Sequence, residues 1–386
     1  MKKNIAVIFG SRSAEHDVSI LTAHTPIISS LLAMSDYDVW PVYISKKGVW
    51  YCDKVMNELS FFKNDNFENE LKKLKPIKMA LNHGLEIIWP GVFSKKVNID
   101  IAFPATHGTY GEDGSLMGLL RMANIPFVGC DLFASAVAMD KVLTKQIMSA
   151  ENIPIAPYVW FTKHEWKKNQ EALRKKISEL KYPLFIKPVH LGSSIGITKA
   201  KTSQELENGI EVALHYDDKI LVEEGVENLI EVTLPIMGNE TPTCALIERP
   251  LNKTEMFDFN DKYLSGGKNT EGANAQYSEL PANIEPALSQ QVIELGRRAY
   301  HTIGCEGVAR IDFLIDNQTK NVYVNEINTL PGSLYIHNWR KVGVSGVDLV
   351  TKLILLANER FDSQKNITHA FKSDILKMGG GNKTQE

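Results

Sequence analysis

The first hundred residues contain uninterrupted apolar runs that stop at a glycine or a polar loop, and this pattern constrains the fold most strongly. Residues 5–9 form such a run before Gly10, and further strands are expected over 39–44 and 99–104. An apolar run without polar alternation is typical of a strand that is buried on both faces of a parallel sheet. The sequence therefore predicts a doubly wound α/β domain whose sites lie at the carboxyl ends of its strands.

Helix-like segments separate these strands. They cover residues 14–34 and the stretch from the loop HGTYGEDG (107–114) to about residue 123. A polar, lysine-rich segment from about 53 to 80 breaks the alternation, and we expect it to be a peripheral insertion. The first domain is predicted to span residues 1–125.

The rest of the chain predicts two further domains and a polar tail. A helix-like stretch precedes strands that look antiparallel, and a second long helix precedes two more strands and a last helix. The central domain, the C-terminal domain and the tail are expected over 126–235, 236–360 and 361–386. The helices are expected over 134–151, 285–303 and 346–358, and the last two strands over 307–316 and 321–328.

The composition excludes several classes of protein. Forty-three Lys and Arg against 46 Asp and Glu give a net charge of −3, so the cationic surface of a nucleic-acid binder is not expected. The 44% hydrophobic content suits a packed globular protein, and no stretch approaches the roughly 18 apolar residues of a membrane span. The N-terminus reads as a first strand, not a signal peptide. Four cysteines far apart in sequence predict reduced thiols in a cytoplasmic protein, with neither a zinc site nor a disulfide framework.

The segment FIKPVHLGSSIG (185–196) is the first candidate site. Lys187 lies inside an apolar strand and would face a large desolvation cost unless an anion meets it. The glycines that follow, with Ser193 and Ser194, offer backbone amides and hydroxyls that can surround phosphate oxygens. The segment matches neither a Walker loop nor a dinucleotide-binding turn, and a glycine-rich hairpin turn is the alternative.

A second candidate site lies in the strands ARIDFLID and VYVNEIN. If the two strands pair, Glu326 and Asn328 share one face and Asp312 can lie opposite them. Two carboxylates in an apolar frame would repel each other without a cation, and oxygen-only ligands suit Mg²⁺. This set predicts a magnesium site, and solvent-facing acids on an edge strand are the alternative.

Four more residues are candidates only in combination with these sites. Lys141 and Lys262 can contact phosphate, and Glu223 and Glu231 can accept hydrogen bonds from an adenine amino group and ribose hydroxyls. Taken singly, each is explained as well by a charged surface residue.

The chain resembles the D-alanine–D-alanine ligase family of ATP-grasp enzymes in a series of segments that run in family order from about residue 4 to 358. They are SAEHDVS, HGTYGEDGSLMGLL, SAVAMDKVLTK, YPLFIKPVHLGSSIGI, FDFNDKYLS, GVARIDFL and NEINTLPG. The resemblance implies an α/β fold of the α+β ATP-grasp type, in which two ATP-grasp subdomains follow the doubly wound domain. It also implies ADP-forming ligation of two D-alanines for peptidoglycan precursor synthesis, with ATP as a substrate and two Mg²⁺ ions, or Mn²⁺, as cofactors.

The resemblance implies roles for individual residues. Glu15 matches the acid that orients the first D-alanine, and Ser193 and Tyr263 match its hydroxyl partners. Arg310 and the amide of Gly332 match the groups that stabilise the oxyanion. The implied substrate contacts are His107 and Lys262, the implied ATP contacts are Lys141, Lys187, Ser194, Glu223, Glu231 and Lys262, and the implied metal ligands are Asp312, Glu326 and Asn328.

One segment departs from the family pattern. After NTLPG, many members carry a serine that holds the second substrate's carboxylate together with the next residue, whereas His337 and Asn338 stand there in this chain. Both side chains can donate to a carboxylate, so we expect them to bind the acceptor. The retained Tyr263 favours an amine acceptor such as D-alanine or D-serine over a hydroxy acid such as D-lactate, and D-alanine is the expected acceptor. D-Serine or another acceptor is the alternative.

Two further expectations concern motion and assembly. Residues 255–278 are rich in Gly, Asn and Ser and predict a lid over the site. Members of the family commonly form homodimers, and the other expected partners are small molecules. A nucleotide-binding protein that has lost catalysis would lack a metal ligand or a phosphate-binding lysine, and none is missing.

Overall fold

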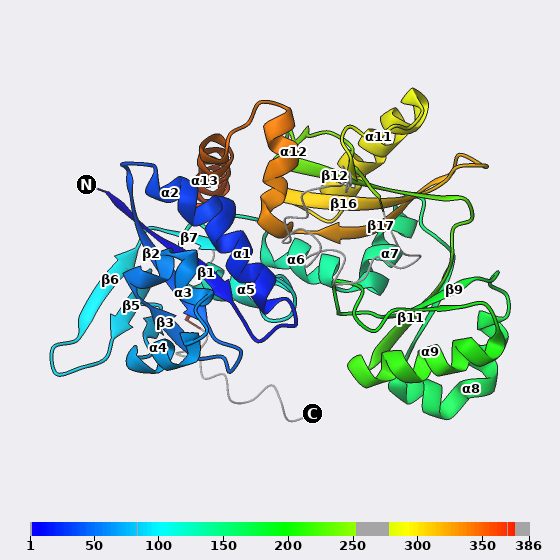
Figure 1. The fold of residues 1–386 in the computed structure, drawn as a ribbon, viewed down its shortest axis with the longest axis horizontal. Helices are drawn as coiled ribbons and strands as arrows, with labels where there is room; N and C mark the ends of the chain where they lie inside the picture. Colours follow the sequence, from blue (N-terminus) through cyan, green and yellow to red (C-terminus); the bar gives the residue numbers. More distant parts are fainter. Residues whose placement is uncertain (1, 83, 252–277, 369, 375–386) are drawn as a thin grey trace.

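The computed structural model describes residues 2–82, 84–251, 278–368 and 370–374. Three parts are visible in Figure 1. The N-terminal domain lies at the left, a sheet with two helices lies at the lower right, and a second sheet lies above and between them. The mixture of helices and sheets confirms the predicted α/β class.

A four-stranded sheet in the order β3-β2-β1-β7 forms the centre of the N-terminal domain. As predicted, the apolar run 5–9 is completely buried. One face of the run packs against the helices that follow it, and the other face packs against α5 (Ser115–Met122). The strands are β1 (Lys3–Gly10), parallel to β2 (Tyr37–Ile44) and β7 (Ile101–Pro104), and β3 (Trp50–Cys52), antiparallel to β2.

The helix expected over residues 14–34 is interrupted at Thr25. The φ and ψ of this residue, −133° and 106°, are those of extended chain. Pro26 follows, and a proline ring disfavours the helical conformation in the residue before it. The helical segments are α1 (His16–Thr22), Ala23–Ile28 and α2 (Ser29–Leu32).

The segment 53–80, expected to be a peripheral insertion, packs into the core instead. Met56 is fully buried, and the ring of Phe62 lies edge-on to Phe9 of β1 with centroids 5.5 Å apart. Its apolar residues are dispersed among lysines because each short helix turns only one side towards the sheet. The helices are Lys54–Asn57, α3 (Leu59–Phe62) and α4 (Phe67–Lys73). An antiparallel sheet that the sequence did not predict follows, formed by β4 (Lys78–Ala80), β5 (Leu85–Trp89) and β6 (Lys95–Ile99).

A pair of helices connects the N-terminal domain to the rest of the chain. They are α6 (Leu132–Met139) and α7 (Lys141–Ala150), where the sequence predicted a single helix. Asp140 separates them, and its carboxylate accepts hydrogen bonds from the N–H groups of Val142 and Leu143, both at 2.9 Å. An aspartate in this position caps a new helix, which explains the break.

The central sheet has the order β10-β9-β11-β8 and is antiparallel throughout, as predicted. The apolar side chains of one face pack against α8 (Lys163–Ile177) and α9 (Ser203–Tyr216). The opposite face carries Lys187 and Glu223 and is turned towards α7. The strands are β8 (Tyr158–Thr162), β9 (Leu184–Pro188), β10 (Thr198–Ala200) and β11 (Lys219–Glu224).

The C-terminal sheet, in the order β13-β12-β16-β17, is also antiparallel. β12 pairs with β16 along its whole length, so residues 229–235, which the sequence assigned to the central domain, share the C-terminal sheet. Helix α11 (Pro286–Thr302) covers the core face (Figure 1). The strands of this sheet are β12 (Leu229–Gly238), β13 (Thr243–Cys244), β16 (Gly307–Asp316) and β17 (Val322–Asn328). A separate two-stranded sheet consists of β14 (Arg249–Pro250) and β15 (Ser278–Glu279). A helical turn (Gly332–Tyr335), α12 (Ile336–Lys341) and α13 (Gly346–Gln364) follow.

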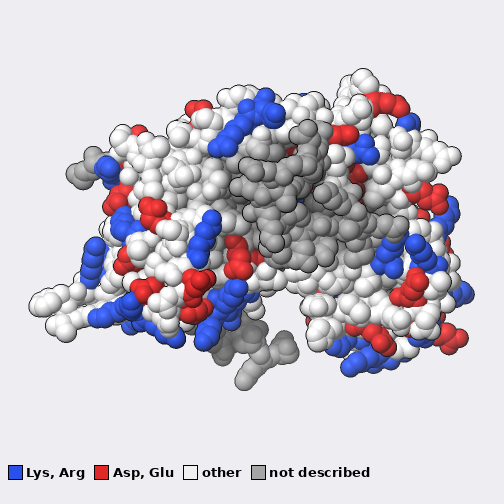
Figure 2. Space-filling model, in the orientation of Figure 1, with Lys and Arg blue, Asp and Glu red and all other residues white. Residues whose placement is uncertain are grey.

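Charged side chains of both signs are mixed on the surface, and the cysteines are unpaired. On the face seen in Figure 2, Lys and Arg side chains are interspersed with Asp and Glu. All four cysteines lie in the described part of the chain as unpaired thiols, three of them buried. Among the described residues, no helix has the length and apolar content that a membrane span requires.

Candidate active site

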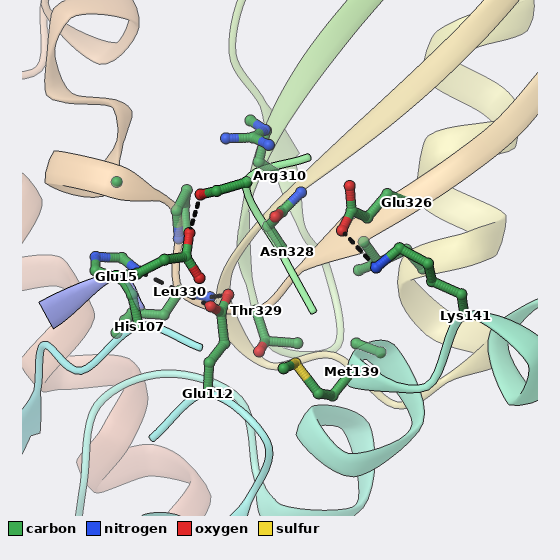
Figure 3. A pocket seen from close by; sticks show the side chains of 16 residues that line it. Glu15, His107, Glu112, Met139, Lys141, Arg310, Glu326, Asn328, Thr329 and Leu330 are labelled. Atoms are coloured by element: carbon green, nitrogen blue, oxygen red, sulfur yellow. Dashed lines mark hydrogen bonds and ion pairs between the residues drawn. The ribbon is translucent and has the colours of Figure 1, made fainter. Parts of the chain in front are cut away.

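A pocket lies where the N-terminal, central and C-terminal sheets approach one another (Figure 3). Its lining comes from the start of α1, the loop after β7, the junction of α6 and α7, the glycine-rich loop after β9, strand β16, and the end of β17 with the loop that follows. Many residues that the sequence singled out meet in this pocket: Glu15, His107, Lys141, Ser193, Arg310, Glu326, Asn328 and Gly332.

Glu15 precedes α1, and its carboxylate accepts a hydrogen bond from the Ser193 hydroxyl of the central domain. Gly108 and Gly192 leave the room that this carboxylate occupies, because a Cβ on either would lie 2.9 or 3.0 Å from Glu15 Oε2. Burial raises the pKa of Glu15, and the neighbouring Glu112 carboxylate raises it further. A bound ammonium group would offset both effects, so the arrangement suits the amine of an amino acid.

His107 and Glu112 form the wall beside Glu15 (Figure 3). His107 is buried, with Nδ1 3.8 Å from Glu112 Oε2. Glu112 Oε1 also accepts a hydrogen bond from the Leu330 N–H at 3.2 Å, so it ties the N-terminal domain to the loop after β17. The sequence analysis did not single out Glu112, although a carboxylate in the glycine-rich loop HGTYGEDG was a usable signal.

The predicted metal ligands lie together on the facing strands β16 and β17. Asp312 is directly opposite Glu326, and the Asn328 amide donates to Asp312 at 3.1 Å. Arg310 donates to both carboxylate oxygens of Asp312, at 2.7 and 2.6 Å, and Lys141 Nζ lies 3.4 Å from Glu326 Oε1. Two carboxylates and an amide oxygen form a set of hard donors that fits a divalent cation with an oxygen shell.

A β-bulge is what turns Glu326 towards the pocket. Strict alternation along β17 would place Glu326 on the same side as the buried Val324. The register of β16 and β17 shifts after Asp312, so that Asn325 has no opposite residue on β16. Ile327 is buried as well. The bulge therefore keeps both Val324 and Ile327 in the core and leaves Glu326 facing Asp312.

Lys187 and Glu223 form a buried ion pair together with Lys145 of α7. Lys187 donates to Glu223, and Lys145 Nζ lies 2.8 Å from Glu223 Oε2, outside hydrogen-bond geometry. Although burial alone raises the pKa of Glu223, the two lysines, Lys145 foremost, lower it to about 2. The sequence analysis missed Lys145, which lies four residues after Lys141 and so on the same side of the helix.

His190 fixes the base of the glycine-rich loop and was not singled out from the sequence either. Its Nδ1 lies 3.0 Å from Asp217 Oδ2 and its Nε2 lies 3.3 Å from Asp140 Oδ2. These hydrogen bonds, that to Asp140 foremost, raise the pKa of His190 to about 9. The loop that carries Ser193 is thereby tied to the start of α7 and to the turn before β11.

The two residues of the divergent segment lie outside the pocket lining. The Asn338 side chain is completely buried, and it accepts from the Leu246 N–H at 3.0 Å and donates to the Leu246 carbonyl at 2.9 Å. His337 Nε2 lies 2.8 Å from the buried Glu248 carboxylate. The Asn338 amide is thus committed to the backbone, whereas His337 remains half-exposed.

The other predicted site residues are placed as follows. Ser194 follows Ser193, and both have left-handed backbone conformations with φ of 58° and 53°. Glu231 lies on β12, on the side away from the buried Val232 and therefore on the Asp312 side of the sheet. Lys262, Tyr263 and nearly all of the predicted lid lie outside the described residues.

Two family models match the chain. Residues 4–130 match the model described as D-ala D-ala ligase N-terminus, and residues 147–355 match D-ala D-ala ligase C-terminus. The chain belongs to the D-alanine–D-alanine ligase family. The resemblance inferred from the sequence motifs is confirmed, and the chain is an enzyme of this ligase family.

Individual relatives agree over nearly the whole ligase. The D-alanine–D-alanine ligase of Clostridium novyi is 37% identical over 375 residues, which cover 93% of this chain and 99% of the relative. That of Chloroherpeton thalassium is 33% identical over 374 residues, which cover 94% and 98%. The structure of the D-alanine–D-alanine ligase from Coxiella burnetii matches with a TM-score of 0.79 at 26% identity, over 98% of both chains. A D-Ala:D-Ser ligase from Enterococcus faecalis matches with a TM-score of 0.78 at 31% identity, over 92% of this chain and all of the other.

Proposed function

We propose that the protein is a cytoplasmic D-alanine–D-alanine ligase that converts two D-alanines and ATP into D-alanyl-D-alanine, ADP and phosphate for peptidoglycan precursor synthesis. The observation that carries the proposal is the pocket in which a carboxylate suited to an amine (Glu15), a lysine suited to phosphate (Lys141) and a guanidinium (Arg310) meet. Each of these groups answers one requirement of the reaction.

Binding of the first D-alanine would use Glu15 and Ser193. The substrate ammonium would pair with the Glu15 carboxylate, whose pKa burial and Glu112 raise in the absence of a cation. Ser193 donates to the same carboxylate and so fixes its orientation. The donor amine would thereby be held at the N-terminal end of α1.

Activation requires that a carboxylate oxygen of the donor attack the γ-phosphorus of ATP, which forms an acyl phosphate and releases ADP. This step brings anionic groups together, so positioning and neutralisation dominate its catalysis. Lys141 and Lys187 would neutralise phosphate oxygens. Asp312, Glu326 and Asn328 would hold Mg²⁺, which when bound neutralises further phosphate charge.

Ligation requires that the amine of the second D-alanine attack the acyl carbon and lose a proton, after which phosphate leaves. The carbonyl oxygen becomes an oxyanion in between, and Arg310 with the Gly332 N–H would stabilise it. A Cβ at Gly332 would meet no atom within 4 Å, so its backbone borders open pocket space. The loss of one such donor costs about 3–4 kcal/mol in other enzymes.

A related ligase with a different acceptor is the second candidate. The placement of Asn338 favours it, because this buried side chain donates to the Leu246 carbonyl and is also hydrogen-bonded to Glu248, instead of facing the carboxylate that the family serine pair holds. The solved D-Ala:D-Ser ligase, 31% identical, demonstrates that acceptor choice varies at this level of similarity. D-Serine is therefore the first alternative acceptor.

An acceptor panel tests the proposal. ADP release by the full chain would be measured with ATP, Mg²⁺ and D-alanine alone, and then with limiting D-alanine plus D-serine, D-lactate or L-alanine. We expect turnover with D-alanine alone and a D-alanyl-D-alanine product by mass spectrometry. Turnover that requires D-serine would favour the second candidate, and an absence of turnover throughout would contradict both.

A further inference from the structure

The loop that carries the Gly332 amide is attached to the N-terminal domain at two points. The Leu330 N–H donates to Glu112 Oε1 at 3.2 Å, and the Ser333 N–H donates to Thr22 Oγ1 at 2.9 Å. Glu112 lines the pocket, whereas Thr22 lies behind it at the end of α1 and is completely buried. Gly332 therefore lies between two hydrogen bonds that cross the domain boundary.

The second attachment holds the first residue of a strained turn. Ser333, Leu334 and Tyr335 have φ of 46°, 51° and 54°, a left-handed conformation that L-residues rarely adopt in succession. Such a run persists only where the surroundings hold each residue. Leu334 is completely buried, and the Tyr335 ring packs under Arg310, with the guanidinium carbon 5.2 Å from the ring centroid. The hydrogen bond to Thr22 keeps Ser333 in its left-handed conformation in the same way.

Thr22 also sets the orientation of His107. Its Oγ1 lies 2.8 Å from His107 Nε2. Because Oγ1 accepts from the Ser333 N–H, it contacts the loop and the His107 ring at the same time. One hydroxyl thus orders a pocket side chain and the adjacent backbone.

The two functional groups at the ends of α1 lie on one side of the helix. Glu15 and Thr22 are seven residues apart, which is close to two helical turns. Glu15 faces the donor amine site, and Thr22 faces the loop of the oxyanion donor. The helix therefore sets the separation between the two parts of the pocket.

We propose that Thr22 is a positioning residue of the ligase, whose hydroxyl holds Ser333 and His107 so that the Gly332 N–H keeps its place at the reacting carbonyl. This inference rests on the proposed function, because the Gly332 amide is needed only where an oxyanion forms.

Substitutions of Thr22 separate the hydroxyl from the shape of the side chain. Thr22→Val keeps the shape and removes the hydroxyl, and Thr22→Ser keeps the hydroxyl. Removal of a whole oxyanion donor lowers kcat by about 100- to 1000-fold in other enzymes, and a displaced donor costs less. We expect Thr22→Val to lower kcat about 10- to 100-fold with the KM for ATP unchanged, and Thr22→Ser to stay within about threefold of the wild type.

Thr162→Val is the matched control. Thr162 caps α8 in the central domain, where its Oγ1 accepts from the Glu165 N–H at 3.2 Å, away from the pocket lining. The same chemical change should lower the melting temperature there and leave kcat within about twofold. The rise in melting temperature on addition of ATP and Mg²⁺ checks that each variant retains its nucleotide site.

The outcomes distinguish the inference from the proposed function. A wild-type protein without ADP release from D-alanine would contradict the proposed function itself. If the wild type is active and Thr22→Val has a normal kcat, the role of Thr22 is overturned. It is also overturned if Thr22→Ser binds ATP but loses as much kcat as Thr22→Val. If Thr22→Val lacks the ATP-dependent shift, Thr22→Ala is compared with Thr22→Ser, and equal kcat values for these two would overturn the role.

Discussion

Replacement of Glu223 by glutamine would leave two lysines buried without their counter-ion. Glu223 is 1% exposed, and it is paired with Lys187 and with Lys145, which is 2% exposed. The variant keeps the size of the side chain and removes only its charge. The two ammonium groups would then repel each other, and only that of Lys187 has partial access to water.

The expected loss follows from the burial of the partners. Breaking a buried ion pair by removal of one member costs about 3–5 kcal/mol. Lys187 is 12% exposed at its side chain and can be partly hydrated, whereas the Lys145 side chain, at 3%, cannot. We therefore expect Glu223→Gln to lower the free energy of unfolding by about 3–5 kcal/mol, with Lys145 as the main cause.

A second substitution should reverse part of this loss. Lys145→Met alone leaves the Glu223–Lys187 pair intact and replaces a buried charge by an apolar chain, for which a cost below about 2 kcal/mol is expected. Combined with Glu223→Gln, it removes the stranded charge, so the double variant should be about 1–2 kcal/mol more stable than Glu223→Gln. Burial lowers the pKa of Lys145. Between this lowered pKa and the ordinary lysine value, the unfolded chain of Glu223→Gln binds more protons than the folded chain, so the stability of this variant should rise with pH over that range, by at most about 1.4 kcal/mol per pH unit.

Urea denaturation followed by circular dichroism and tryptophan fluorescence measures all four proteins of this cycle. A double variant whose loss equals the sum of the two single losses would refute the reasoning, since it would mean that Lys145 and Glu223 do not interact. A Glu223→Gln variant as stable as the wild type would refute the burial of the pair itself.

Three other predictions concern the ligand set, the loop base and the divergent segment. Asp312→Asn and Glu326→Gln should each abolish ADP release and move the melting temperature by only a few degrees, because both carboxylates are partly exposed ion-pair members; near-normal turnover of either would contradict the metal assignment. In the wild type, the pKa of His190 is about 9 in the folded chain and about 6.5 in the unfolded chain. The protonated ring therefore stabilises the fold fully below pH 6.5, and this stabilisation is lost as pH rises through 9. The melting temperature of His190→Ala should therefore fall below that of the wild type at pH 6 and match it at pH 10, and a constant difference would contradict this. Asn338→Ala should lower the free energy of unfolding by about 1–3 kcal/mol, because it leaves the backbone groups of Leu246 unpaired. The KM for the acceptor should not change. A raised acceptor KM with unchanged stability would show instead that Asn338 binds the acceptor.

The sequence predicted the parts of the fold that local patterns determine. The run 5–9 is buried on both faces because all of its residues are apolar, and the pairing of the strands that carry Asp312 and Glu326 follows from their adjacency in sequence. The packing of the segment 53–80 into the core could not be predicted, because its apolar residues face the same side only once its short helices have formed. The bulge at Asn325 was equally invisible, since a strict alternation explains the sequence of β17 almost as well.

The residues that sequence reasoning missed share a physical property. Glu15 and Asp312 belong to motifs because their chemistry admits few side-chain types, whereas Thr22, Glu112 and Lys145 act on other protein groups that many side chains could contact. Their roles depend on partners that the fold brings from distant parts of the chain: Ser333 for Thr22, Leu330 for Glu112 and Glu223 for Lys145. Asn338 illustrates the same point from the opposite direction, because the amide that could bind a substrate carboxylate is bonded to a backbone segment 92 residues away. Motifs therefore locate the groups that meet the substrate, and only the packed structure identifies the groups that hold them in place.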